Sequence, residues 1–277
     1  MINKIEYVTT MDFYGAEDYL TLKRPMSHYE KGIAIIEGDK VVARFLASSF
    51  ELVSILLTNT WFDIYKDNLS HRKEALNVYI ADAKLIKSIV GFKYHQGIIA
   101  IAKIPPNRSL DDVINCGLNS NLLVALDRLE SSENTGAIVR NCAACGVGAL
   151  IVGETSADPW LRRAIRNSMG NIFKLPVIKS KSLADTLRAL RNVYHYKIFG
   201  AALDKNSTFL ECADFTGNTC LVFGNEGVGL SDSILGMCDA TVRIPMASGV
   251  DSFNVACASA IMIYEAGRKM GLMIKKC

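Results

Sequence analysis

A loop followed by a helical stretch places an amide and a guanidinium where an anion could be bound. Residues 130–136 read ESSENTG and follow the apolar run LLVALDRL. Asn134 and Arg140 lie six residues apart at the start of the helical stretch, where free backbone N–H groups and the helix dipole favour anions. One interpretation is a phosphate held by Arg140. The alternative is a purely structural helix start, with Asn134 as the cap and Arg140 in a surface ion pair.

A second and a third loop also carry residues typical of a ligand site. Residues 224–231 read GNEGVGLS, and three glycines around Glu226 favour a close approach of the backbone to a ligand. Residues 244–254 read IPMASGVDSFN and precede a long apolar helical stretch. The glycine order does not match the dinucleotide fingerprint, and the sequence contains no G-K-S/T phosphate loop. These patterns argue against a nucleotide-dependent oxidoreductase and against ATP hydrolysis.

The elements that must position these loops are short apolar runs, which alternate with helical patterns from residue 121 onward. Such alternation predicts an open α/β domain, in which helices cover both faces of a parallel sheet. In sheets of this kind ligands bind beyond the carboxyl ends of the strands. The predicted strands are LLVALDRL, ALIVG, LPVIKS, YKIFGAAL, TCLVFGN and ATVRIPM.

The first half of the chain has a different pattern, and we expect a small α/β domain over residues 25–107. Its predicted elements are the strand GIAIIEG, the helix VVARFLASS, the strand FELVSILLTN, a charged helix around residues 68–77, and the strands NVYIAD and GIIAIAKI. Residues 1–24 are interpreted as an arm or an added helix. The junction between the two domains is expected at residues 105–120, which contain a Pro pair, a Gly and three Asn. Residues 108–120 are therefore interpreted as a linker, and residues 121–277 form the larger domain.

The composition of the 277 residues is that of a folded globular protein, with half of them hydrophobic and 21% charged. The longest apolar runs are shorter than a membrane-spanning helix, and the first residues lack the pattern of a secretory signal. The eight cysteines lack the spacing of a disulfide framework. We therefore expect a cytoplasmic protein with reduced thiols. For the pair Cys142 and Cys145, packing within a helix is favoured over a redox or metal role, and no metal site is expected.

One segment carries charge of almost a single sign, although the formal net charge is only +3. Residues 162–191 contain eight Lys or Arg residues and one acid, Asp185. Such a run forms either a solvated helix face or a surface that attracts a polyanion such as RNA. Asp158-Pro159 is a typical helix start. We therefore expect the candidate RNA-binding residues on one face of that helix: Arg162, Arg163 and Arg166.

Aromatic residues near basic ones give a weaker indication of an RNA partner. Tyr29, Phe92 and Tyr94 could stack on unpaired bases, and His95 could contact RNA. Packing in the core is the favoured alternative for the aromatic rings.

Together, the three loops resemble the ordered motifs of the SpoU (TrmH-like) family of RNA ribose 2′-O-methyltransferases. The matching segments are SSENTGAIVRNCAACGVGALIVG, LVFGNEGVGLS and IPMASGVDSFNVACASAIMIYE, with IRNSMGNIFKLPV between the first two. The resemblance covers about residues 121–268. YHQGIIAIAKIP is similar, more weakly, to the small substrate-binding domain of family members that act on ribosomal RNA. Ser-Ser-Glu precedes Asn134 where the family commonly has Asp-Pro, and Phe253 stands where leucine is usual, but neither change removes a reacting group.

The resemblance implies a SPOUT-type catalytic domain, which is a trefoil-knotted open parallel sheet that binds S-adenosylmethionine in the knot. It also implies an obligate homodimer whose active site draws on both subunits. The expected reaction is methylation of a ribose 2′-hydroxyl in RNA, with ribosomal RNA favoured over transfer RNA. A non-catalytic RNA-binding protein of the same fold is the alternative, against which the presence of Asn134, Arg140 and Gly224 argues. The cofactor residues implied by the family are Leu203, Gly224, Ile244, Met246 and Phe253.

The same resemblance implies roles for the polar residues of the loops. Arg140 is the expected catalytic residue, either as a base together with an RNA phosphate or as the organiser of that phosphate. Because a guanidinium stays protonated in proteins, we favour the second role, with stabilisation of the developing alkoxide. Asn134 would orient Arg140 or the ribose, and Glu226 would anchor the second loop or dimer contacts. Ser252 and Asn254 would position the RNA and the third loop.

Overall fold

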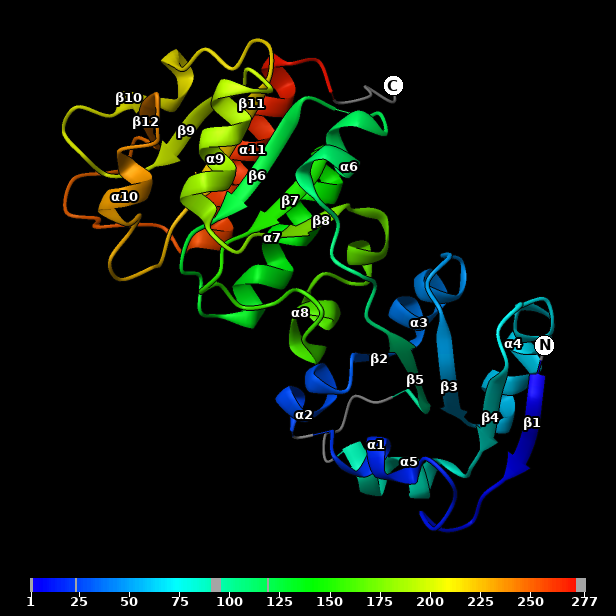
Figure 1. Cartoon of the computed structure of the whole chain (residues 1–277). Helices are drawn as coiled ribbons and strands as arrows, with labels where there is room; N and C mark the ends of the chain where they lie inside the picture. The colour runs from blue at the N-terminus through cyan, green and yellow to red at the C-terminus, as the bar shows by residue number, and fades with distance from the viewer. Residues whose placement is uncertain (1, 23, 91–95, 119, 273–277) are drawn as a thin grey trace. The chain divides into compact units, whose positions relative to one another are not determined.

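The computed structural model describes residues 2–22, 24–90, 96–118 and 120–272, and their arrangement is drawn in Figure 1. The chain forms two compact units. The first contains residues 1–106 and 160–173, and the second contains residues 107–159 and 174–277. The RNA contacts suggested for Phe92, Tyr94 and His95 fall outside the described residues. None of the helices described here is long and apolar enough to cross a membrane.

The second unit is built on a seven-stranded sheet in which every strand pairing is parallel. The strand order is β10-β12-β9-β11-β6-β7-β8. All residues of β6, β7 and β11 are buried, as expected of strands that are covered on both faces. The predicted open parallel α/β domain is confirmed. The strands are β6 (Leu122–Leu126), β7 (Ala149–Val152), β8 (Val177–Lys179), β9 (Lys197–Ala201), β10 (Thr208–Phe209), β11 (Thr219–Phe223) and β12 (Ala240–Arg243).

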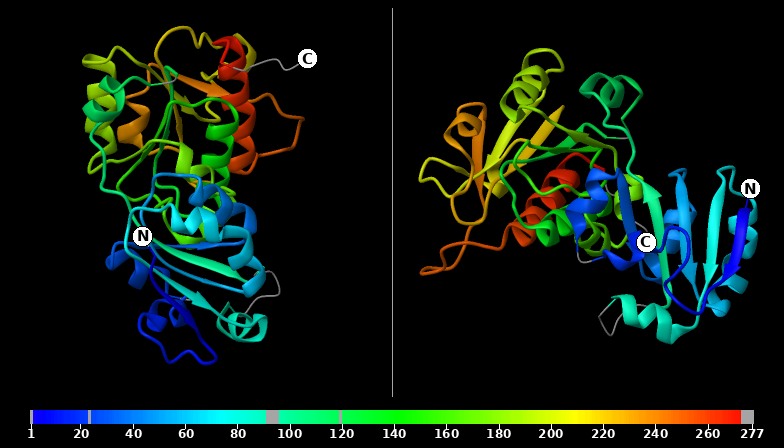
Figure 2. Two further views of the ribbon diagram at one scale, coloured as in Figure 1. Left: turned by 90° about the vertical axis from the view of Figure 1, so that its right-hand side faces the viewer. Right: turned by 60° about the horizontal axis from the view of Figure 1, so that its bottom comes forward.

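Helices cover both faces of this sheet, as the two further views in Figure 2 show. On one face Val113, Leu187 and Ile234 join strand residues in a buried core, and on the other face two long helices pack together. The helices on the face with the buried core are α6 (Leu110–Asn115), α9 (Leu183–Asn192) and α10 (Asp232–Leu235). The two helices that pack together on the other face are α7 (Ser132–Ala144) and α11 (Val255–Lys269).

Helix α6 lies within residues 108–120, for which the sequence predicts a linker. Ser109 caps this helix by accepting a hydrogen bond from the backbone N–H of Asp112 at 3.0 Å, and the carboxylate of Asp112 accepts one from the Ser109 N–H in return. Val113 is buried in the core of the second unit. The segment is therefore a packed element of that unit.

The first unit contains a mixed five-stranded sheet with the order β1-β4-β3-β5-β2. Its strands are β1 (Ile2–Tyr7), β2 (Ile33–Glu37), β3 (Leu52–Leu57), β4 (Leu76–Ile80) and β5 (Ile98–Lys103). Its helices are α1 (Ala16–Leu20), α2 (Pro25–Glu30), α3 (Asp39–Leu46), α4 (Asn59–Ser70), α5 (Ala83–Val90) and, from later in the chain, α8 (Arg162–Asn167). Tyr19 of α1 and Ile86 of α5 are buried against the sheet.

Two elements of this unit differ from the sequence-based expectation. Strand β1 pairs along β4, so residues 1–24 include an edge strand of the sheet besides α1. The charged helix expected around residues 68–77 is α4, which begins at Asn59 and ends at Ser70. Glu74, which follows it, accepts a hydrogen bond from the backbone N–H of Leu52 at 2.9 Å, and this contact belongs to the turn into β4.

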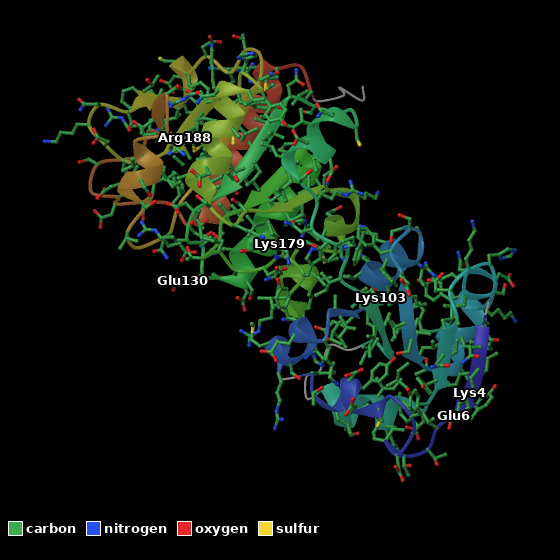
Figure 3. All side chains as sticks on the ribbon, viewed as in Figure 1. Lys4, Glu6, Lys103, Glu130, Lys179 and Arg188 are labelled. Atoms are coloured by element: carbon green, nitrogen blue, oxygen red, sulfur yellow. The ribbon has the colours of Figure 1, made fainter. Side chains whose placement is uncertain are left out.

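Residues 160–173 belong to the first unit, although the residues before and after them in the sequence belong to the second. The rings of Trp160 and Phe173 contact those of Phe45 and Phe50. The helix in this segment is α8, which begins at Arg162. The prediction that Asp158-Pro159 starts a helix is wrong, because that pair lies outside α8. The Asp158 carboxylate instead forms an ion pair with Lys179 at 3.3 Å, and Lys179 is labelled in Figure 3.

Glu37, at the end of β2, holds two arginines of α8. Its side chain is 7% exposed; its Oε2 lies 2.5 Å from Arg162 Nη2, and its Oε1 lies 3.1 Å from Arg166 Nη1. Arg162 also donates to the carbonyl of Leu22 at 2.9 Å. The side chain of Arg162 is 10% exposed and that of Arg166 is 47% exposed. Part of the charge in the basic segment is therefore neutralised within the first unit.

We predict that Glu37→Ala destabilises the first unit by about 3 kcal/mol, because it leaves the guanidinium of Arg162 buried without its counter-ion. The two tryptophans of the chain, Trp61 and Trp160, both belong to this unit. Urea unfolding followed by tryptophan fluorescence therefore measures the decrease in the free energy of unfolding of this unit.

Glu51→Ala is the matched control for that variant. Its carboxylate lies 2.6 Å from Lys103, which Figure 3 labels, but both side chains are about half exposed. Removing this pair should cost less than about 1 kcal/mol. An equal decrease in the free energy of unfolding in Glu37→Ala and Glu51→Ala would contradict the larger contribution predicted for the buried ion pair.

Candidate functional site

A cavity of about 550 Å³ lies at the carboxyl ends of β9, β11 and β12 in the second unit. Side chains of α11 close one side of it, including Ala258 and Met262. Glu226 and Ser252 also line it. The structure brings together here all five residues that the family resemblance implies for a cofactor: Leu203, Gly224, Ile244, Met246 and Phe253.

The side chain of Asn134 connects the three loops. Its amide Nδ2 donates to the carboxylate of Glu226 in the second loop, and its Oδ1 accepts from Nδ2 of Asn254, at the end of the third loop, at 3.3 Å. The cap of α7 is Ser131, whose hydroxyl accepts from the backbone N–H of Asn134 at 3.2 Å. Asn134 is therefore not the cap, and its amide is available for these contacts between loops.

Asn254 has a second task, because it caps α11. Its Oδ1 accepts hydrogen bonds from the backbone N–H groups of Ala256 at 2.9 Å and Cys257 at 3.4 Å. The same residue thus begins the helix that walls the cavity and contacts Asn134. The role expected of Asn254, to position the RNA and the third loop, stays a prediction.

Asn225 shapes the second loop, although the sequence analysis does not single it out. Its Oδ1 accepts from the backbone N–H groups of Gly227 at 2.8 Å and Val228 at 3.3 Å. Its Nδ2 donates to the carbonyl of Arg128, a residue in the left-handed region at φ 54°. An asparagine that folds back on its own turn is a known turn signal, and it could have identified this residue.

Asp127 joins the end of β6 to the second loop. This residue follows β6 and is buried, and its Oδ2 accepts from the backbone N–H of Ser231 at 2.7 Å and from the Ser231 hydroxyl at 2.9 Å. Buried carboxylates require such partners. An acid at the end of the apolar run LLVALD is the sequence signal that could have found it.

Gly224 is required by the path of the second loop. A Cβ atom at this position would lie 2.5 Å from the backbone carbon and oxygen of Gly229 and 2.6 Å from the backbone nitrogen of Leu230. Two backbone hydrogen bonds between Asn225 and Gly229, at 3.1 and 2.9 Å, hold these strands of the loop together. No larger residue fits without moving the backbone.

The other predicted site residues do not line this cavity. Arg140 is exposed on α7 and does not line the cavity of its own chain. Within the described part of the chain its guanidinium forms no ion pair, so the alternative of a surface pair is not observed. The three arginines predicted to bind RNA, Arg162, Arg163 and Arg166, belong to the first unit.

Cys142 and Cys145 lie at the carboxyl end of α7. Cys142 is fully buried, and burial raises the pKa of both thiols. A raised pKa disfavours the thiolate, which is the reactive form of cysteine. Across residues 2–22, 24–90, 96–118 and 120–272, no group of three or more His, Cys, Asp or Glu side chains is placed to hold a metal ion.

A parallel sheet whose carboxyl-edge loops enclose a cavity defines an α/β domain that binds a small molecule at the ends of its strands. Residues 121–264 match the model of the SpoU rRNA Methylase family, and the chain belongs to this family. This membership agrees with the resemblance identified from the three loops.

Known proteins are similar over most of the chain. An uncharacterized tRNA/rRNA methyltransferase of Mycobacterium bovis is 32% identical over 249 residues, which cover 89% of this chain and 84% of that protein. The 23S rRNA (guanosine-2′-O-)-methyltransferase RlmB of Acinetobacter baylyi is 31% identical over 197 residues, covering 70% and 79%. The AdoMet-bound rRNA methyltransferase of Sinorhizobium meliloti shares the fold, with a TM-score of 0.82, 24% identity, and coverage of 95% and 98%.

We predict that Gly224→Ala opens the second loop, because the added methyl group would overlap the backbone of Gly229. Hydrogen exchange followed by mass spectrometry should show faster exchange of the Asn225 and Gly229 amides. Gly227→Ala is the control, since a Cβ there meets only Asn225 Oδ1 at an ordinary 3.5 Å. Unchanged exchange in Gly224→Ala would show that the loop tolerates a side chain at this position.

Proposed function

We propose that this protein transfers the methyl group of S-adenosylmethionine to a ribose 2′-hydroxyl of 23S ribosomal RNA. The observation that carries the proposal is the single cavity in which the second and third SpoU motifs meet, joined to the first motif through Asn134. Ribosomal RNA is favoured because the RlmB relative, 31% identical, is named for that substrate.

The cavity suits S-adenosylmethionine in size and in chemistry. Its volume of about 550 Å³ lies within the usual range for small-molecule sites. The apolar walls formed by Leu203, Ile244 and Phe253 suit a purine ring, and the backbone of the turn at Gly224 offers hydrogen-bonding groups to a ribose. When bound, the cofactor supplies a methyl group activated by a positive sulfonium.

The chain's own residues must then help a weak nucleophile. Methylation of the ribose 2′-hydroxyl would release its proton, which the RNA phosphate held by Arg140 would accept, and negative charge would develop on the ribose oxygen. Arg140 stabilises that charge and holds an RNA phosphate next to it. Asn134 keeps the three loops in one arrangement through Glu226 and Asn254, and Ser252 positions the RNA.

The proposal includes a homodimer and a knotted chain path through residues 224–231 and 244–254. A groove of about 710 Å³ is lined by residues of α7 and α11 together with residues 210–211 and 244–245. Most of its lining residues are apolar, and Tyr264 among them is 53% exposed. A second copy would cover this groove. The position of Arg140 outside the cavity of its own chain supports an active site to which the partner subunit contributes this arginine.

Two further expectations stay predictions. RNA binding by Arg162, Arg163 and Arg166 is one, and the observed partner of both Arg162 and Arg166 is Glu37. A cytoplasmic location is the other.

The direct test is transfer of labelled methyl groups from S-adenosylmethionine to 23S ribosomal RNA and to transfer RNA, both taken from a strain that lacks the protein. Nucleoside analysis should find the label in a 2′-O-methylnucleoside of the ribosomal RNA. Label in transfer RNA alone would show that transfer RNA, and not ribosomal RNA, is the substrate. A protein that does not bind S-adenosylmethionine would contradict the proposed methyl transfer itself.

We predict that Arg140→Ala lowers the rate of methyl transfer by roughly a hundredfold or more, the usual loss for one group that stabilises a developing oxyanion. Binding of S-adenosylhomocysteine, measured by calorimetry, should be unchanged because the proposed contacts of Arg140 are with the RNA phosphate and the ribose oxygen. Arg188→Ala is the control, since Arg188 pairs with Asp185 on the surface of α9. Loss of cofactor binding in a folded Arg140→Ala variant would contradict this assignment.

We predict that Tyr264→Glu converts the protein to a monomer, because it adds a third carboxylate, beside Glu211 and Glu265, to a groove that a second copy would bury. Sedimentation equilibrium measures the mass directly. Tyr7→Glu is the matched control, since Tyr7 is 68% exposed on β1 of the first unit. A wild-type protein that sediments as a monomer would remove the homodimer from the proposal.

A further inference from the structure

The proposed cofactor cavity contains one positive side chain to which no role has been assigned above. Arg243 is the last residue of β12 and lines the cavity. The other charged residues that line it are acids, namely Asp204, Glu226 and Asp251. A cation surrounded by acids could simply pair with one of them.

Arg243 forms no such pair in the described part of the chain. Its Nε atom is buried and has no hydrogen-bond partner there, and none of the ion pairs among these residues includes it. Leaving a buried N–H group of a charged side chain without an acceptor is costly. An orphaned donor at the wall of a cavity therefore indicates an acceptor that arrives with a ligand.

The guanidinium is also held in place. Its Cζ lies 4.3 Å from the centre of the Phe209 ring, a distance at which the positive charge is attracted to the ring face. Phe209 on β10 and Arg243 on β12 are direct neighbours in the parallel pairing of these strands. The side chain is thus positioned before any ligand binds, which lowers the entropy lost on binding.

We propose that Arg243 binds the α-carboxylate of the S-adenosylmethionine methionine group, and that Phe209 is a positioning residue for it. This inference rests on the proposed function. The carboxylate is the only anionic group of the cofactor, since the ammonium and sulfonium groups are positive and the adenosine is neutral. The planar fork of a guanidinium matches a carboxylate through two parallel hydrogen bonds.

The test compares two ligands that differ only in that carboxylate. S-adenosylhomocysteine carries it, and S-adenosyl-3-thiopropylamine lacks it but keeps the amine and the adenosine. Calorimetry should show that Arg243→Gln weakens binding of S-adenosylhomocysteine about tenfold or more, the usual effect of losing a charge-assisted hydrogen bond. Binding of the decarboxylated ligand should be unchanged.

Two further variants are compared with Arg243→Gln: a control on the surface and a conservative substitution at the same position. Arg188→Gln, on the labelled surface position of α9 in Figure 3, should bind both ligands as the wild type does. Arg243→Lys should recover part of the affinity for S-adenosylhomocysteine only. An equal loss for both ligands would place the guanidinium on the adenosine or in the packing and overturn the assignment, as would no loss for either.

A measurement on the wild type keeps the inference testable if Arg243→Gln does not fold. The Nε–H resonance of Arg243 in an NMR spectrum should shift on addition of S-adenosylhomocysteine and stay in place on addition of the decarboxylated ligand. Shifts with both ligands, or with neither, would overturn the assignment. A wild-type protein that binds neither ligand would instead contradict the proposed function itself.

Discussion

Parallel pairing of β12, β9, β11 and β6 is the constraint on which the site depends. Because these strands run in the same direction, the loops that follow them meet at one edge, although their residues are far apart in the sequence. An antiparallel partner would send one of these loops to the opposite edge. A slip of one residue would also turn every buried side chain of a strand to the other face. The sheet therefore determines which loops meet at the site and which side chains of each strand face each side of the sheet.

Within that frame, a few amide and carboxylate groups determine the shape of the loops. Asn134, Asn225 and Asp127 each join segments that are far apart in the sequence through hydrogen bonds. Apolar packing alone would leave the polar backbone of these loops without partners, and such groups are costly when buried. These polar contacts hold the shape of the loops, while the lining of the cavity combines apolar side chains such as Leu203 and Ile244 with charged ones such as Glu226 and Arg243. Networks of this kind lose more than one contact when a single member is removed.

The sequence alone predicts the second unit well because its strands are continuous apolar runs. The strands from β6 to β9, β11 and β12 are found where the pattern places them, and the predicted cofactor residues share one cavity. Helix α4 is less predictable, since only Leu69 of its residues is buried and its apolar period is weak. The pairing of Glu37 with α8 is not predictable from local pattern, because the partners are more than a hundred residues apart. A run of arginines has the same appearance in the sequence whether its partner is solvent, RNA or a distant acid.

The chain passes between its two units three times, at residues 106–107, 159–160 and 173–174. A fragment that begins at residue 107 would therefore keep Trp160 and Phe173 but lose the rings of Phe45 and Phe50 that they contact. A fragment of residues 1–106 would keep Glu37 but lose both of its arginines. A recombination event with one breakpoint at residues 106–107 would combine residues 1–106 of one relative with segment 160–173 of another. The first unit would then contain contacting residues from two different proteins. Exchange of the first unit between relatives thus requires the short segment 160–173 to be exchanged with it, so one crossover in the gene cannot replace either unit completely.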